Sequence, residues 1–240
     1  MTTSLPCLLL YFYVIFNVIN LIQTIPKGYL IGASYDPASS SNSLFKIDPL
    51  SGKFTVLTPL TNYRAYDVTY DFIHKIFYVL GSETTLEKEA AMSVAKVNPF
   101  NGTKNIEQLR QNLPYGSDYL VGIDITKRKI ISEITDSNLP AYLCYDNKTN
   151  AFYGMEIFQS ERGCRLVRLN PYNGTMDILS KDLKDYEPSA GTCHEGYYFT
   201  MIVKSLDKQN IITFDLSNSS TIIANKPAQE YLDSFAFVPL

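Results

Sequence analysis

The sequence has no tryptophan and only two histidines, His74 and His194, among its 240 residues. A Ser/His/Asp or Cys/His catalytic site needs a histidine beside a nucleophile and an orienting acid, and both histidines fall in predicted hairpin turns. No G-x-S-x-G elbow and no glycine-rich phosphate loop is present. The sequence therefore predicts no assembled catalytic site of these classes and no cofactor.

Clusters of basic residues are also missing. Lysines and arginines number 21 against 24 acidic residues, and they are scattered along the chain. Without a basic stripe to neutralise phosphates, nucleic acid is not an expected partner. Helical periodicity is nearly absent after residue 26, whereas 18 tyrosines and 13 phenylalanines suit the half-buried faces of strands. The composition predicts an all-β fold.

The first segment differs from the rest because residues 5–22 are almost wholly apolar. We expect a signal peptide over residues 1–24, cleaved after Thr24, followed by one domain over residues 25–240. Asn17 and Asn20 would be costly within a permanent membrane anchor. The segment lacks both a basic n-region and an Ala-x-Ala site, so an uncleaved anchor attaching the protein to a membrane remains the alternative.

Four N-glycosylation motifs follow this segment, at Asn101, Asn147, Asn173 and Asn218. Together with a signal peptide they predict a secreted, extracellular or lumenal glycoprotein. At Asn101 and Asn173 the alternative is that Asn-Gly is present because it is a favoured turn pair.

An internal repeat organises the rest of the chain. One kind of hairpin, with a turn begun by Asp or Asn, occurs at residues 44–57, 94–103, 166–179 and, more faintly, 211–220. A second kind occurs at residues 65–79, 119–133, 141–154 and 189–203. The two kinds alternate and give a four-stranded unit roughly every 45 to 50 residues, a spacing typical of propeller blades.

The run from Leu44 through Asp48-Pro49 to Gly52 resembles the apolar-x-x-x-Asp-Pro-x-x-Gly hairpin of β-propeller repeat proteins. The resemblance covers almost the whole mature chain but selects no particular family, and the tryptophan-bearing signatures of several propeller classes are missing. It implies an architecture and leaves the chemistry open.

We predict about five blades. Blades two, four and five take residues 65–107, 141–179 and 189–223, and blade three is truncated to the hairpin at 119–133. The first blade is completed by the C-terminal strand at 233–238, which removes an exposed sheet edge. An irregular β-sandwich is the rival architecture.

In a propeller, hairpin turns lie on one face of the disc and the remaining connections lie on the other. All four glycosylation motifs fall in hairpin turns, so a ligand is expected to use the opposite face. Tyr63, Tyr115, Tyr186 and Tyr231 each precede an innermost strand and are candidate binding residues at the channel mouth. The alternative is that they pack identically in each blade.

The mature chain keeps three cysteines, Cys144, Cys164 and Cys193, without the spacing of a zinc site. Cys144 and Cys193 lie at comparable points of neighbouring innermost strands and are the predicted disulfide. Three buried, unpaired cysteines are the alternative.

These features favour a non-catalytic binding module for an extracellular protein or carbohydrate. One alternative is a metal-dependent propeller hydrolase that uses loop carboxylates, with candidates at Asp36, Asp118, Glu161, Asp185 and Glu187. Another is a structural component of a matrix or coat.

Overall fold

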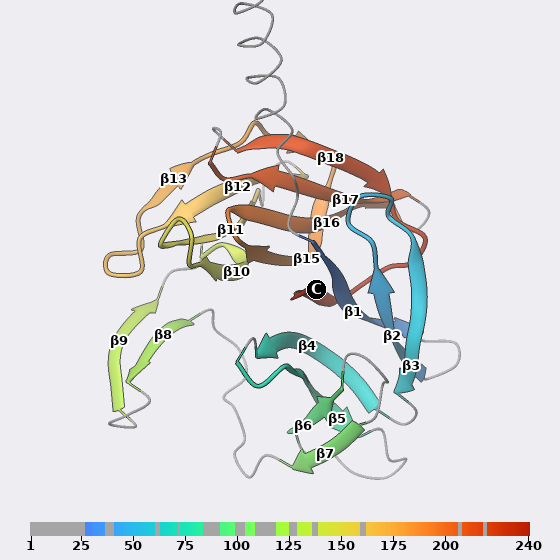
Figure 1. Ribbon diagram of the computed structural model, residues 1–240. Helices are drawn as coiled ribbons and strands as arrows, with labels where there is room; N and C mark the ends of the chain where they lie inside the picture. The colour runs from blue at the N-terminus through green and yellow to red at the C-terminus, as the bar shows by residue number, and fades with distance from the viewer. Residues whose placement is uncertain are drawn as a thin grey trace, which may run out of the picture.

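The structure is a computed structural model that describes residues 27–36, 41–60, 63–71, 73–83, 92–98, 104–108, 119–124, 129–135, 139–158, 162–205, 208–217 and 220–240. Over these residues the chain forms strands β1 to β19 and no helix (Figure 1). No helix there could cross a membrane. The predicted signal peptide, Tyr115, Asn101 and Asn218 lie outside the described residues.

The strands form four large sheets, which we name the β1, β4, β10 and β15 blades after their first strands in the chain. In the β1 blade the order is β19 (Ser234–Pro239), β1 (Gly28–Asp36), β2 (Ser41–Ile47) and β3 (Phe54–Leu60). The β4 blade contains β4 (Tyr63–Asp71), β5 (Ile76–Glu83), β6 (Met92–Val97) and β7 (Lys104–Gln108).

The two C-terminal blades follow the same plan. The β10 blade contains β10 (Ala141–Asp146), β11 (Ala151–Ile157), β12 (Gly163–Leu169) and β13 (Met176–Ile178), with β14 (Leu183–Lys184) also paired to β12. The β15 blade contains β15 (Glu187–His194), β16 (Tyr197–Ser205), β17 (Lys208–Asp215) and β18 (Thr221–Pro227). A separate two-stranded sheet joins β8 (Tyr119–Asp124) to β9 (Lys129–Thr135).

The sheets are arranged around an axis, with β4, β10, β15 and β19 as the innermost strands (Figure 1). These inner strands contact one another in the order β10, β15, β19, β4. The predicted all-β propeller is therefore confirmed, and the rival sandwich of two facing layers is wrong. The number of blades is four and not about five. The hairpin predicted as a truncated third blade is present among the described residues as the separate two-stranded sheet of β8 and β9, which is not counted as a blade.

The two ends of the described chain meet in one sheet. Strand β19 pairs antiparallel with β1 in a register that runs from Gly28 opposite Pro239 to Ala33 opposite Ser234. The last strand of the chain is thus the innermost strand of the first blade, as predicted. Pairing with β19 covers the edge of β1 and gives this blade its fourth strand.

The Asp or Asn that begins each of these hairpin turns stabilises the turn through its side-chain oxygen. The Oδ1 atoms of Asp48, Asp71 and Asp215 each accept a hydrogen bond from a backbone N–H two residues on, at 2.9 Å. Asn170 Oδ1 accepts the same bond from Tyr172 at 3.0 Å. The repeat therefore encodes Asx turns that reverse the chain, and it carries no ligand site by itself.

Three apolar clusters lie between neighbouring blades. One joins the β1 and β4 blades, one joins the β1 and β15 blades, and one joins the β10 and β15 blades. The rings of Phe237 in β19 and Phe199 in β16 stack with centroids 5.1 Å apart, which bridges two blades. Because both faces of β19 are packed in this way, the inner strands are held in fixed positions around the axis.

Candidate functional site

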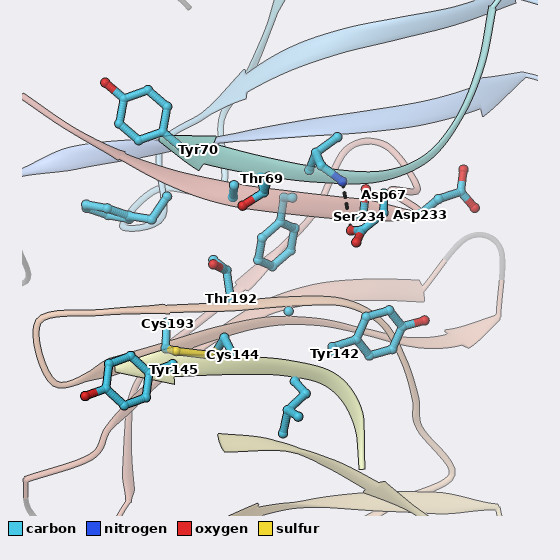
Figure 2. A pocket seen from close by; sticks show the side chains of 16 residues that line it. Asp67, Thr69, Tyr70, Tyr142, Cys144, Tyr145, Thr192, Cys193, Asp233 and Ser234 are labelled. Atoms are coloured by element: carbon cyan, nitrogen blue, oxygen red, sulfur yellow. Dashed lines mark hydrogen bonds between the residues drawn. A yellow bond between two sulfur atoms is a disulfide. The ribbon is translucent and has the colours of Figure 1, made fainter. Parts of the chain in front are cut away.

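A cavity of about 600 Å³ opens where the four inner strands meet. Its lining comprises residues 67–70 of β4, 142–145 of β10, 191–193 of β15 and 233–237 at β19 (Figure 2). A volume of this size is in the range of small-molecule sites. Cavity walls made of strands from four blades form a rigid frame for the side chains that point inward.

Three of these inner strands are irregular near their beginnings. The register slips between Ala65 and Asp67 in β4, between Ala141 and Cys144 in β10, and between Pro188 and Ala190 in β15. A β-bulge shifts the alternation of side chains and re-aims the residues beside it. Asp67 and Tyr142 lie at two of these bulges, and both side chains line the cavity.

The polar end of the cavity consists of Asp67, Tyr142, Asp233 and Ser234, which Figure 2 shows together at one end of the strands. Asp67 is open to water in the cavity yet surrounded by protein, and this enclosure raises the pKa of its carboxyl; a hydrogen bond from the Val68 N–H at 2.8 Å opposes the shift. Among the described residues that line the cavity there is no lysine, arginine or histidine. The described residues at the polar end thus include two carboxylates, those of Asp67 and Asp233.

Tyr142 occupies a backbone conformation that few tyrosines adopt, with φ of 54°. Its carbonyl accepts a hydrogen bond from the Tyr198 hydroxyl at 3.0 Å. A Cβ at Gly191 would lie 2.5 Å from that hydroxyl and 2.9 Å from the Tyr142 Cβ, so glycine is required there. Burial, followed by the neighbouring Tyr231 and then by the charges of Asp233 and Asp67, raises the pKa of Tyr142 to about 12 and keeps its phenol protonated.

The other end of the cavity carries Tyr70 and Tyr145 and is braced by a disulfide (Figure 2). Cys144 in β10 and Cys193 in β15 form this bond, with Cα atoms 5.8 Å apart, and they are the pair expected from the sequence. Cys164 is free and buried, and burial raises the pKa of its thiol to about 12. The disulfide covalently joins two inner strands at the cavity wall.

The tyrosines singled out in the sequence do not act alike. Tyr63 is 1% exposed in a core cluster and its hydroxyl donates to the Val79 carbonyl at 3.0 Å, which is the packing role. Tyr186 is half-buried against the cluster between the β10 and β15 blades. Tyr231 is half-buried, and its pKa is raised by burial and then by Asp233 and Glu187. Of these three, Tyr231 is the one whose pKa is influenced by a residue of the polar end, Asp233, although Tyr231 does not line the cavity.

Both glycosylation motifs within the described residues lie in exposed turns. Asn147 is in the turn between β10 and β11, and Asn173 is in the turn between β12 and β13. Since β10 and β12 run parallel on either side of β11, these turns lie at the same end of their sheet. Tyr142 is the second residue of β10 and Asn147 follows the last one, so the polar end of the cavity is at the opposite end of that strand from the glycosylation motif.

At the outer strands, hairpin turns and the other connections are not clearly separated onto two faces of the disc. A Cβ at Gly52, in the turn between β2 and β3, would lie 2.6 Å from the Pro227 carbonyl oxygen at the end of β18. An outer hairpin turn of one blade therefore touches the connection that leaves the neighbouring blade. The prediction that hairpin turns occupy one face applies best to the inner hairpins.

Several residues considered for catalysis are engaged elsewhere. Asp185 pairs with Lys204 at 3.0 Å and Glu187 pairs with Arg162 at 3.0 Å. Asp118 and Glu161 lie outside the described residues, as does the Asp36 side chain. Among the described residues, no group of three or more His, Cys, Asp or Glu side chains is placed to hold a metal ion.

Neither histidine lines the cavity. The exposed His74 contacts Asp71 Oδ2 through Nδ1 at 2.7 Å. His194 stacks on Phe237 with ring centroids 4.6 Å apart, and burial lowers its pKa against the opposing charges of Glu195 and Asp146.

Comparison with known proteins identifies the fold alone. No protein-family model matches the sequence, and no curated protein matches it. A chain of the nidogen/laminin complex superposes with a TM-score of 0.51 and 12% identity, covering 87% of this chain and 97% of that one. TolB from Acinetobacter baumannii superposes with a TM-score of 0.50 and 12% sequence identity. The match covers 87% of this chain and 55% of the TolB chain.

A Bacteroides fragilis protein provisionally named a 6-phosphogluconolactonase gives a TM-score of 0.52 and 10% identity, covering 90% of this chain and 99% of that one. These identities are too low to transfer an activity, and the names of the similar proteins differ widely. Nidogen and TolB are propeller proteins, so this chain shares their architecture.

Proposed function

We propose that the protein is a secreted or cell-surface N-glycosylated propeller that acts as a non-catalytic binding module for a protein or a carbohydrate. The observation that carries the proposal is the cavity among the inner strands, whose polar end lies away from the turn that holds Asn147. A rigid concave site with aromatic walls and a few convergent polar groups is the usual form of a binding site.

Two further observations support an extracellular setting. The disulfide between Cys144 and Cys193 is of a kind that persists in oxidising compartments. One structural neighbour was solved as a nidogen/laminin complex, so a propeller of this shape occurs in a protein complex. Glycans at Asn147 and Asn173 would shield that side of the β10 blade and leave the polar end of the cavity accessible.

Secretion and glycosylation can be tested by expressing the full chain in a eukaryotic host. The protein should accumulate in the medium and lose mass on glycosidase treatment. Asn147→Gln and Asn173→Gln should each remove one glycan, whereas Thr175→Ser preserves the motif at Asn173 and should keep it. An intracellular, unglycosylated product would contradict this part of the proposal.

Binding can be tested on arrays of oligosaccharides and of purified extracellular domains. Thr69 lines the cavity, so Thr69→Trp should fill it and abolish binding to whichever ligand is found, regardless of its charge. Thr55→Trp is the matched control, since Thr55 is exposed on the outer strand β3 and does not line this cavity. A ligand unaffected by Thr69→Trp, or no ligand on either array, would contradict use of the cavity.

A further inference from the structure

We propose that Asn147 accepts a glycan only before the β10 and β15 blades have docked, whereas Asn173 remains an acceptor in the folded protein. The proposal rests on the glycosylation included in the proposed function and specifies when each motif is open to the modifying enzyme. Its basis is that the motif at Asn147 is tied to the neighbouring blade, while the motif at Asn173 is tied to its own turn.

N-glycosylation requires the threonine of the motif as well as the asparagine. The amide nitrogen of the asparagine attacks the anomeric carbon of a lipid-pyrophosphate-linked oligosaccharide. A carbon–nitrogen bond forms, the bond from that carbon to the pyrophosphate oxygen breaks, the nitrogen loses one proton, and the lipid pyrophosphate leaves. A motif whose threonine is bonded within the folded protein must therefore open before the enzyme can use it.

Asp146 connects the motif at Asn147 to the β15 blade. Its side chain is 0% exposed. Oδ2 accepts hydrogen bonds from the N–H and the hydroxyl of Thr149, at 2.9 and 2.8 Å. Oδ1 accepts one from the Gly196 N–H at 2.9 Å, in the turn between β15 and β16. One buried carboxylate thus holds the threonine of the motif and the neighbouring blade together, and opening the motif would leave that charge without its donors.

The lysine of the same motif also contacts the β15 blade. Lys148 Nζ donates to the Glu195 carbonyl at 3.3 Å and lies over the Tyr197 ring, 6.0 Å from its centroid. The turn that receives these contacts is itself fixed, because the Gly196 carbonyl accepts the Leu216 N–H at 2.8 Å. Releasing the motif therefore requires the two turns to separate.

The contacts that close this motif form late in synthesis. The hydrogen bond between Gly196 and Asp146 joins residues 50 positions apart. Cys144, two residues before Asp146, is bonded to Cys193, which is 49 positions further along the chain. Until β15 has been made and has docked, none of these bonds exists and the motif is open.

The bonds at Asn173 lie within a single hairpin turn. Asn173 Oδ1 accepts hydrogen bonds from the N–H and the hydroxyl of Thr175, at 3.1 and 2.8 Å, and both residues are exposed. The Gly174 N–H donates to the Asn170 carbonyl at 2.9 Å in the same turn. Exposed turns open locally at far lower free energy than packed elements separate. The folded protein should therefore still present Asn173 to the enzyme.

The test uses the full chain made in a eukaryotic host whose synthesis of the lipid-linked oligosaccharide is inhibited, so that it folds without glycans. A purified oligosaccharyltransferase and its donor are then added, and peptide mass spectrometry follows each site. In the folded protein, Asn147 should be modified about tenfold more slowly than Asn173, or slower still. In the reduced, alkylated and unfolded chain the two rates should be similar.

Variants identify the junction between the blades as the cause, with each rate compared with that of the same variant unfolded. Asp146→Ala releases Thr149 and Gly196 and leaves the motif intact, so it should raise the rate at Asn147 in the folded protein several-fold. If Asp146→Ala does not fold, Lys148→Ala and Cys144→Ala/Cys193→Ala decide, since each loosens the same junction. Asn170→Ala is the matched control: it removes the bond from Asn170 to the Tyr172 N–H in the other turn and should leave Asn147 unchanged.

Equal rates at the two sites of the folded wild type, including modification of neither, would overturn the inference. So would an unchanged rate at Asn147 in every folded variant that loosens the junction. Both results would leave the glycosylation of the proposed function in place if the unfolded chain accepts the oligosaccharide. An unfolded chain that accepts it at neither site would overturn the inference and that part of the proposed function together, so the two failures are distinguishable.

Discussion

Asp67 is a residue whose placement costs folding free energy. Enclosure by the inner strands raises the pKa of its carboxyl above the ordinary value of 3.8, so the folded state holds its charge less favourably than the unfolded chain does. Groups placed against stability in this way are typical of functional sites.

Substituting Asp67 with asparagine should stabilise the protein at neutral pH. In the wild type, the unfolded carboxyl ionises as pH rises through 3.8 while the folded one ionises only at its raised pKa, so the destabilisation grows across that interval and is complete above it. Thermal unfolding of both proteins between pH 3.5 and 7.5 should show an advantage for Asp67→Asn that increases with pH and then levels off. A constant difference, or a less stable variant at pH 7, would contradict this account of Asp67.

Sequence reasoning found some of these residues and missed others for a physical reason. The cysteine pair could be found because the two residues occupy matching positions in successive repeats. Asp67 and Tyr142 could not, because a bulge beside each one breaks the two-residue alternation from which inward-facing positions are deduced. The dipeptide Ala-Tyr occurs at both bulges, at residues 65–66 and 141–142. This shared dipeptide could have indicated where the bulges lie, but it does not indicate which side chain points into the cavity.

The hairpins illustrate how local chemistry was predictable. Asp48 holds its turn through the Leu50 N–H, and Gly52 takes a positive φ of 70° to complete the reversal. These roles follow from residue type and spacing alone. The contact of this turn with Pro227 in the next blade joins residues far apart in the sequence, and the repeat pattern does not specify such a contact.

Gly52→Ala should therefore cost more than a backbone penalty. A non-glycine residue at this φ costs about 1–2 kcal/mol, and the new Cβ would also lie 2.6 Å from the Pro227 carbonyl oxygen. Gly174→Ala is the matched comparison, because Gly174 has a similar φ of 74° in the equivalent turn of the β10 blade. Urea unfolding should show the larger loss for Gly52→Ala; equal losses would mean that the contact between blades adds nothing.

The disulfide should make a large contribution because it closes a long loop. Cys144 and Cys193 are separated by 49 positions, for which the chain-entropy relation gives about 4 kcal/mol. The double variant Cys144→Ala/Cys193→Ala should lose about that much free energy of unfolding in urea. Reduced wild-type protein is the control and should show a similar loss, whereas an unchanged midpoint in both would contradict a structural role for the bond.

Ring closure distributes this stability around the propeller. The first and last described strands pair with each other, and β19 packs against the β4 blade on one side and the β15 blade on the other. The sequence predicted this closure because both ends of the repeat array lacked partners. It also predicted that the hairpin at 119–133 has only two strands, as the separate sheet of β8 and β9 does. Only the count of about five blades, which included this hairpin, differs from the four blades of the structure.

Closure through β19 predicts that a single core substitution there weakens the ring as one unit. Phe237 is 1% exposed and stacks on both Phe199 and His194 of the β15 blade, so Phe237→Ala should cost about 3–5 kcal/mol. Tyr172→Ala, at a position that is 93% exposed, should change stability by less than about 0.5 kcal/mol. Because β19 joins the two ends of the array, far-UV circular dichroism and tyrosine fluorescence should still report one coincident transition in Phe237→Ala, shifted to lower urea. Two separated transitions would show instead that the blades flanking β19 unfold independently, and that the terminal strand does not couple them.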